Sequence, residues 1–301
     1  MSSDSVLHTE ELTKYYGKRR GIDGVNLDVQ SGEVFGYLGP NGAGKTTTIR
    51  TLLGLLRPNG GAAAVLGHDI VRHSLEIRRS IGYLPGELTI YDNLTGTEFL
   101  SYLGHLRGGV EWGFVEQLAG RLECDLLSRI RSLSHGNRQK LGLIQAFMSR
   151  PNLLILDEPT IGLDPLMQQE FYHLLAEVSQ EGRTVFLSSH IMPEVERVCD
   201  RVAIIREGRV VAVEDVATLK SRALRRLEIH FAGPVSAERF NGIDGVRDVT
   251  VQDSILSCTV VGELDALVKA AAESHVVNLI SQEPSLEEVF LTYYQGGDNA
   301  G

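Results

Sequence analysis

Cysteine is scarce in this chain, and long apolar runs are absent. The three cysteines, Cys124, Cys199 and Cys258, are far apart and form no CxxC motif, so neither a disulfide framework nor a zinc site is expected, and a reducing compartment fits. No stretch approaches the roughly 18 consecutive apolar residues of a membrane-spanning helix, and the N-terminal segment has no apolar signal core. Any role at a membrane is therefore expected to depend on a partner.

Positive charge is also in short supply. The formal net charge is −10, from 29 basic and 39 acidic residues, so the chain lacks the general attraction to phosphate backbones on which nucleic-acid binding depends. We therefore expect no nucleic-acid partner. Hydrophobic residues make up 43% of the 301 residues and charged residues 23%, which is typical of a packed globular protein. This length favours one large domain with a small appendage.

The large domain is predicted to be α/β. From residue 6 to about 215, short β-rich runs alternate with helical patterns, which indicates a largely parallel sheet. A helical pattern of leucine and isoleucine follows a glycine-rich loop and is expected to continue over 49–56, until Pro58 stops it. The clearest strand patterns lie at 25–29, 33–38, 153–159 and 184–190.

The pattern changes after residue 220, so we expect domains at 1–220 and 221–301. Strands are predicted at 227–231, 247–251, 255–261 and 276–280, and helices at 235–240, 263–274 and 285–294. The order βαββαβ with a final helix indicates a small α+β, ferredoxin-like domain. Ser285 and Glu288 form a capping box at the start of the final helix.

A phosphate-binding loop is the strongest motif of the sequence. Residues 39–47 read GPNGAGKTT, which matches G-x-x-x-x-G-K-[ST] between a predicted strand and a predicted helix. Glycines let successive N–H groups surround phosphates, Lys45 reaches the β and γ phosphates, and Thr46 holds magnesium. The residues expected to contact nucleotide here are Gly39, Pro40, Asn41, Gly42, Ala43, Gly44, Lys45, Thr46 and Thr47.

Two further motifs supply chemistry. LLILDEP, at 153–159, ends in Asp157, which can bind magnesium through its water shell, and Glu158, which can polarise an attacking water as general base. LSHGNRQKL, at 133–141, begins a helix that Ser134 can cap, and Gly136 allows close approach of a ligand to the backbone.

In this order and at these separations, the phosphate loop, LSHGNRQ, LLILDEP, IGLD and a strand ending in SSH resemble the nucleotide-binding domain of an ABC transporter over residues 6–215. The resemblance implies a P-loop NTPase fold, with a RecA-like core and a helical signature subdomain, and an ATPase that uses ATP and Mg²⁺. It also implies that Ser134 and Gly136 act in trans on the ATP of a second subunit. By the same resemblance, Tyr16 stacks on adenine, with Tyr15 as its neighbouring competitor, His190 contacts the γ phosphate, and Asp164 lies in a dimer-contacting loop.

The sequence departs from the family pattern in two places. Gly86, in YLPGEL, stands where the family usually has glutamine, and we expect water or Glu87 to take over part of its role toward magnesium. In the signature, His135 and Asn137 replace glycine and glutamine, whereas the serine and second glycine are retained.

YLPGEL, LSHGNRQK and an appendage ending in SLEEVF are together similar to the exporter subfamily with a separate six-helix permease, of which bacterial drug and antibiotic exporters are typical. The resemblance places the permease's coupling helix near residues 86–107, where Tyr91, Phe99 and Tyr102 are candidates to line a groove. It implies a peripheral protein at the cytoplasmic face of the membrane, paired with a second ATP-binding subunit that is identical or closely related.

Three other interpretations are open. An importer subunit would share every catalytic residue, and a soluble ABC ATPase of translation or DNA repair would use the same chemistry as a switch. Such factors usually carry two of these domains or a long coiled coil, and neither is found in this sequence. A scaffold with a dead site is disfavoured because Lys45, Asp157, Glu158 and His190 are all present.

Overall fold

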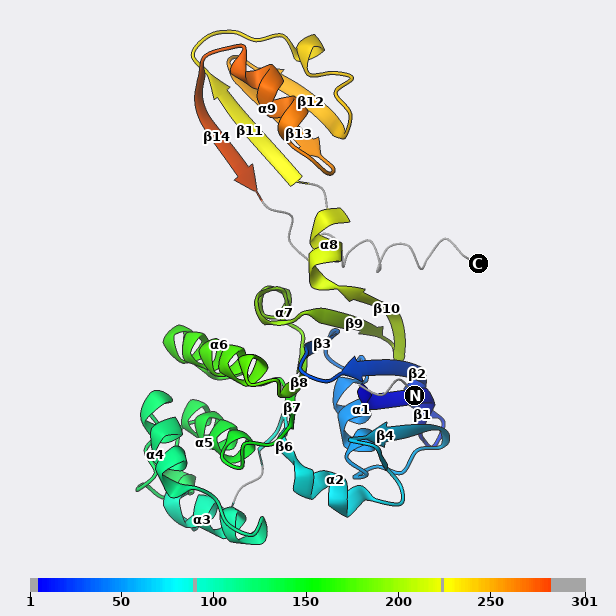
Figure 1. Ribbon diagram of the computed structural model, residues 1–301, viewed down its shortest axis with the longest axis vertical. Helices are drawn as coiled ribbons and strands as arrows, with labels where there is room; N and C mark the ends of the chain where they lie inside the picture. Colours follow the sequence, from blue (N-terminus) through cyan, green and yellow to red (C-terminus); the bar gives the residue numbers. More distant parts are fainter. Residues whose placement is uncertain (1–4, 89–90, 223–224, 283–301) are drawn as a thin grey trace. The chain divides into compact units, whose positions relative to one another are not determined.

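The computed structural model describes residues 5–88, 91–222 and 225–282 (Figure 1). It divides into two compact units, Met1–Glu214 and Asp215–Gly301. This division falls ahead of the expected boundary between 220 and 221, because helix α8 (Val216–Arg222) belongs to the second unit. The helix expected over 285–294 lies outside the described residues.

The first unit is built around a six-stranded sheet. Its strands, in spatial order, are β10 (Arg209–Asp215), β9 (Arg201–Arg206), β3 (Val34–Leu38), β8 (Thr184–Ser189), β7 (Leu153–Asp157) and β6 (Ile81–Leu84). The pairs from β9 to β6 are all parallel, which confirms the predicted largely parallel sheet. Strands β3, β7 and β8 are buried at every residue, as expected for strands covered on both faces.

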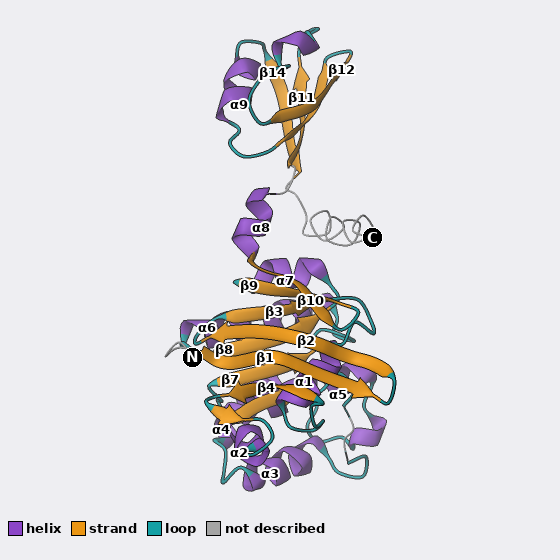
Figure 2. Ribbon diagram, turned by 90° about the vertical axis from the view of Figure 1, so that its right-hand side faces the viewer, coloured by secondary structure: helices purple, strands orange, loops and turns teal. Residues whose placement is uncertain are grey.

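A second, four-stranded sheet lies beside the first, and Figure 2 shows its long strands side by side. Its order is β2 (Arg19–Gln30), β1 (Ser5–Tyr16), β4 (Gly60–Val65) and β5 (His68–Asp69), with antiparallel pairs. Helix α1 (Lys45–Leu52) packs between the two sheets, where Ile49 and Leu52 join one core with Phe35 and Val65.

Helix α1 is shorter than predicted. It ends at Leu52 and does not continue through 49–56, because Gly54 takes a positive φ of 63° and turns the chain beneath the next helix. A Cβ atom at Gly54 would approach Ser74 Cβ to 2.4 Å. The leucines that follow extend the periodic pattern without extending the helix.

The remaining helices flank the parallel sheet. Helix α6 (Pro165–Gln180) packs on β8, and α7 (Met192–Val198) packs on β3. Helices α3 (Gly96–Leu106), α4 (Trp112–Arg121) and α5 (His135–Phe147) lie together beside β6 as the helical subdomain (Figure 1). The other two elements are α2 (Ser74–Ser80) and η1 (Ile130–Ser132). Across the described ranges, no helix has the length and apolar character needed to cross a bilayer.

The second unit contains an antiparallel sheet of order β12 (Val246–Gln252), β13 (Ile255–Val260), β11 (Arg225–Phe231) and β14 (Val276–Gln282). All four strands were predicted, and helix α9 (Asp265–Ala272) covers one face of the sheet. The predicted helix at 235–240 is wrong: only the three-residue turn η2 (Ala237–Arg239) forms, capped by Ser236.

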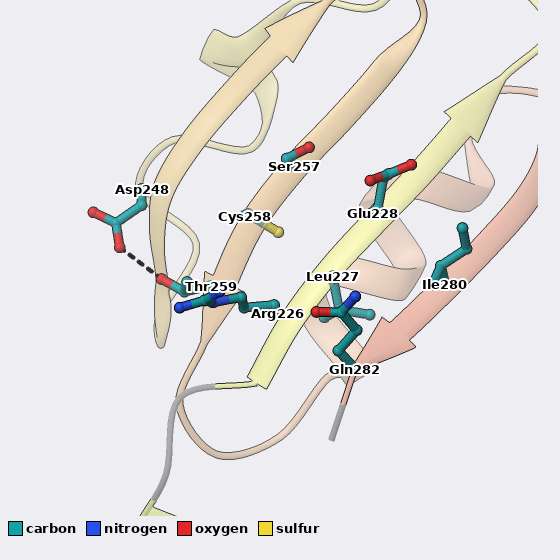
Figure 3. A pocket seen from close by; sticks show the side chains of 9 residues that line it. All are labelled: Arg226, Leu227, Glu228, Asp248, Ser257, Cys258, Thr259, Ile280 and Gln282. Atoms are coloured by element: carbon teal, nitrogen blue, oxygen red, sulfur yellow. Dashed lines mark hydrogen bonds between the residues drawn. The ribbon is translucent and has the colours of Figure 1, made fainter. Parts of the chain in front are cut away.

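The face of this sheet away from α9 carries polar side chains. A shallow hollow of about 280 Å³ lies over it, lined among others by Glu228, Ser257 and Thr259, and Thr259 donates a hydrogen bond to Asp248 at 2.8 Å (Figure 3). Leu227 turns to the other face and is buried in the core. The alternation of buried and open residues along β11 accounts for this division.

Candidate active site

The phosphate-binding loop connects β3 to α1, as predicted. Gly42 and Gly44 take positive φ angles of 81° and 113°, which side chains with a Cβ adopt only at a cost. A Cβ on Gly39 would lie 2.4 Å from the carbonyl oxygen of Ile205, and one on Gly44 would lie 2.8 Å from that of Gly21. The glycines are therefore required by close backbone packing as well as by the turn.

Lys45, the first residue of α1, is 6% exposed and directed back into this loop. Its Nζ donates hydrogen bonds to the carbonyl oxygens of Gly39 at 2.6 Å and Pro40 at 3.2 Å. The same Nζ lies 3.0 Å from Glu158 Oε1. The fold therefore brings Lys45, the predicted phosphate ligand, into direct contact with Glu158, the predicted general base.

Glu158 is held in an uncommon backbone conformation directly after β7. Its φ is +52°, a region that a non-glycine residue occupies only when its surroundings hold it there. Its N–H donates to the carbonyl oxygen of Ser188 at 3.1 Å. Its second carboxylate oxygen, Oε2, lies 2.7 Å from His190 Nδ1, so the carboxylate bridges Lys45 and His190.

Asp157 is completely buried at the end of β7. Ser188 Oγ donates to its Oδ1 at 2.5 Å, but its Oδ2 is buried without a hydrogen-bond partner. A Cβ on Gly86 would lie 3.2 Å from this Oδ2. A buried carboxylate oxygen without a partner is costly unless it binds something, so the residues present fit a cation held by Asp157 with Thr46.

A cavity of about 730 Å³ opens over the phosphate loop, a volume typical of sites for small organic ligands. Tyr16 lines this cavity, is 47% exposed, and has its hydroxyl 3.4 Å from Thr47 Oγ1. Tyr15 is not among the lining residues. The lining is formed by Tyr16, Arg19, Arg20, Gly21, Asn41, Gly42, Gly44, Lys45, Thr46, Thr47, Arg50, Gly86, Glu87, Glu158 and Ile161.

Three arginines in this lining, Arg19, Arg20 and Arg50, were not predicted from the sequence. For Arg19 and Arg20, the basic run at 18–20 was the available signal, because guanidinium groups bind phosphate oxygens well. Several expected site residues do not line the cavity, namely Gly39, Pro40, Ala43, Ser134, Gly136, Asp157 and His190. Gly39 and Pro40 contact Lys45, and His190 contacts Glu158.

Ser134 caps helix α5, as predicted from the sequence, by accepting the N–H of Asn137 at 3.2 Å. Gly136 packs against the loop after β7, where an added Cβ would lie 2.5 Å from the carbonyl oxygen of Gly162. The ring of His135 packs on Gly162, where an added Cβ would lie 2.5 Å from His135 Cδ2. Asp164 caps α6 by accepting the N–H groups of Leu166 and Met167, each at 3.1 Å.

The segment proposed for the permease contains an exposed aromatic pair. Tyr91 and Tyr102 have exposed fractions of 61% and 46%, and their rings meet edge to face at 6.0 Å. The prediction that Phe99 is a candidate to line this groove is wrong. Phe99 is 4% exposed and packs inside the domain, because its face of α3 turns inward. Among the three aromatics, only the two tyrosines are available to a partner.

The chain is similar to known proteins along most of its length. The family model described as ABC transporter matches residues 22–161, and a model described as AAA domain, putative AbiEii toxin, Type IV TA system, matches residues 128–195. The Linearmycin resistance ATP-binding protein LnrL of Bacillus subtilis is 32% identical over 95% of this chain and 97% of its own. The Bacitracin transport ATP-binding protein BcrA of Bacillus licheniformis is 34% identical over 97% and 98%.

A solved structure entitled "Structure of ATP binding subunit of ABC transporter" superposes with a TM-score of 0.66 at 32% identity. It covers 71% of this chain and 92% of its own. Relatives of this identity that align over nearly the whole chain show common descent and not merely a shared fold. The chain therefore belongs to the family of ABC transporter ATP-binding subunits, which are ATPases.

Proposed function

We propose that this subunit powers export of an antibiotic or drug-like compound through a separate membrane permease. The names of LnrL and BcrA, which refer to linearmycin resistance and bacitracin transport, support this substrate class. The observation that carries the catalytic part is the Glu158 carboxylate, which contacts Lys45 at 3.0 Å and His190 at 2.7 Å beside a nucleotide-sized cavity.

The reaction is transfer of the γ phosphoryl group to water. Lys45 exchanges its contacts with Glu158 and the Gly39 carbonyl for phosphate oxygens, which frees the Glu158 carboxylate to orient a water and accept its proton. The bond from the γ phosphorus to the bridging oxygen breaks as the bond to the water oxygen forms. His190 holds Glu158 in position and donates toward the γ phosphate. Tyr16 stacks on the adenine at the open side of the cavity.

Thr46 and Asp157 are the residues that hold Mg²⁺ in this proposal. The buried Oδ2 of Asp157, which has no hydrogen-bond partner, supports this assignment. Magnesium supplies neutralisation of phosphate charge and usually binds through one or two protein oxygens together with water and phosphates. Gly86 offers no side chain here, and Glu87, which lines the cavity, is the residue able to supply an oxygen through water.

A second copy or a close paralogue completes the site. Ser134 and Gly136 lie at the start of α5 and outside the cavity formed by their own chain, which is consistent with action in trans. A helix start with its free N–H groups attracts anions. ATP bound by the phosphate loop of one subunit is thus closed over by the Ser134 helix of the other, and loss of the γ phosphate reopens the pair.

The permease contacts the segment around 86–107 and places the subunit at the cytoplasmic face of the membrane. The exposed Tyr91 and Tyr102 pair supports this surface. Import through the same site is the alternative, as is a soluble switch function. Purification with the membrane partner distinguishes them, because compounds that raise ATP turnover of the complex identify an exporter and its substrate class.

The catalytic proposal is tested with Glu158→Gln. The variant should bind Mg-ATP with nearly unchanged affinity but hydrolyse it at least about 100-fold more slowly, because the amide cannot accept the water's proton. Glu177→Gln, on the outer side of α6, is a control that should leave hydrolysis unchanged. Undiminished steady-state hydrolysis by Glu158→Gln would remove Glu158 as the base.

A further inference from the structure

Behind the catalytic residues lies a buried carboxylic acid that the mechanism above does not use. Glu194, in helix α7, is 2% exposed. Within the described ranges, no lysine or arginine forms an ion pair with it. Burial of a charged group without an ion pair destabilises the folded state, and an apolar residue at this position would often give a more stable fold. A buried glutamate here therefore suggests a functional role.

Glu194 is joined to the loop that carries His190. Ser189 Oγ donates to Glu194 Oε2 at 2.5 Å and accepts the N–H of Ile191 at 2.9 Å. These two hydrogen bonds enclose His190, since they fix the residues on either side of it. The position of the His190 backbone therefore depends on a hydroxyl that Glu194 orients.

The same carboxyl also faces the loop that follows Glu158. Thr160, two positions after Glu158 in the sequence, is 3% exposed, and its hydroxyl lies close enough to Glu194 to lower the pKa of this carboxyl. Glu194 thus lies between the loop of the general base and the loop of the histidine, whose side chains meet at 2.7 Å. The carboxyl is therefore bonded to the loop of the histidine and lies near the loop of the general base.

We propose that Glu194 is a positioning residue of the ATPase site, which holds His190 against Glu158 through its hydrogen bond to Ser189. This inference rests on the proposed roles of Glu158 and His190. The partner of Glu194 is the Ser189 hydroxyl, which can donate or accept. A neutral carboxylic acid or an amide can therefore satisfy it, whereas a methyl group cannot.

The electrostatic surroundings agree with a neutral group. Burial raises the pKa of Glu194 to about 7, and the nearby Glu158 carboxylate also raises it, whereas His190 lowers it. From the neighbouring elements, Tyr172 of α6 and Cys199 at the end of α7 also face it, and the pKa of each is raised, first by burial and then by Glu194. Close to neutral pH, a large fraction of the molecules therefore carries a proton here.

The test is steady-state ATP hydrolysis by the full chain carrying Glu194→Ala, Glu194→Gln, Ser189→Ala or the double alanine substitution. Glu194→Ala should lower kcat about tenfold, because small misalignment of catalytic groups is costly, and should leave the KM for ATP within about twofold. Glu194→Gln should restore kcat to within about twofold of the original chain. The two alanine substitutions should be non-additive, because they break the same bridge.

Glu196→Ala, in the same helix, is the control and should hydrolyse ATP at the original rate. If Glu194→Ala does not fold, as judged by circular dichroism, then Ser189→Ala must lower kcat at unchanged KM. Additive effects, an unchanged kcat in Glu194→Ala, or a glutamine variant as slow as alanine would overturn the inference. If Glu158→Gln hydrolyses ATP slowly while the Glu194 and Ser189 variants keep the original kcat, only this inference fails. If Glu158→Gln also keeps the original kcat, the proposed function fails.

Discussion

Lys45 Nζ and Glu158 Oε1 form an ion pair of 3.0 Å in which both side chains are nearly buried. Lys45, which is expected to bind phosphate, and Glu158, which is expected to orient water, are therefore paired with each other in this arrangement. We expect a triphosphate to compete with Glu158 for the ammonium, so that ATP binding would free the carboxylate to orient water. Catalysis would then require this exchange of contacts at Lys45.

Loss of the ammonium should chiefly affect binding. Lys45→Ala removes a charge-assisted contact to the phosphates and is expected to weaken Mg-ATP binding by about 10- to 100-fold, measured by titration calorimetry. Lys18→Ala is the matched control, since Lys18 is exposed and lies outside the cavity lining. Equal affinities for the two variants would contradict the assignment of Lys45.

Gly86 should matter through the space that it leaves beside Asp157. In Gly86→Ala, the added Cβ would lie 3.2 Å from the buried Oδ2, so the Mg²⁺ concentration for half-maximal hydrolysis should rise by about tenfold. Binding of Mn²⁺ to the ATP complex, followed by electron paramagnetic resonance, gives a second readout. Gly113→Ala, where an added Cβ meets no atom within 4 Å, should leave both measurements unchanged.

The start of the signature helix should not tolerate a side chain. Gly136→Ala would place a Cβ 2.5 Å from the carbonyl oxygen of Gly162, which should lower ATP turnover and destabilise the fold by about 1 to 3 kcal/mol. Gly120→Ala in α4, where nothing lies within 4 Å, should instead stabilise by up to about 1 kcal/mol. Urea unfolding of the two variants measures the contrast.

Glu194 should make stability depend on pH. Its pKa is raised from 4.5 to about 7 in the folded protein, so the unfolded chain loses this proton first, and the free energy of unfolding falls as the pH rises from about 4.5 to about 7. Glu194→Gln removes this contribution, and its stability relative to the original chain should increase by up to about 3 kcal/mol between pH 5 and pH 8. A constant difference over that range would contradict the assigned pKa.

The sequence predicted the parts of the site that follow from local patterns. The phosphate loop, the strand ending in Asp157, and the Ser134 cap each have a signature within a few residues, and the structure contains each of them. The four strands of the second unit were likewise predicted. Patterns of this kind depend on a short stretch of chain.

Features set by tertiary packing could not be predicted in this way. The end of α1 depends on contact between Gly54 and Ser74, and the burial of Phe99 depends on which face of α3 turns inward. Residues 235–240 have an apolar spacing that suits a helix, yet they form only a capped turn.

The central claim is that ATP is clasped between Lys45 of one subunit and the Ser134 helix of another. Sedimentation of Glu158→Gln measures this most directly. With Mg-ATP the protein should sediment at twice the mass of the chain, and Ser134→Ala added to it should return it to single chains that still bind ATP. Glu158→Gln that binds ATP yet sediments only as a single chain would contradict the account.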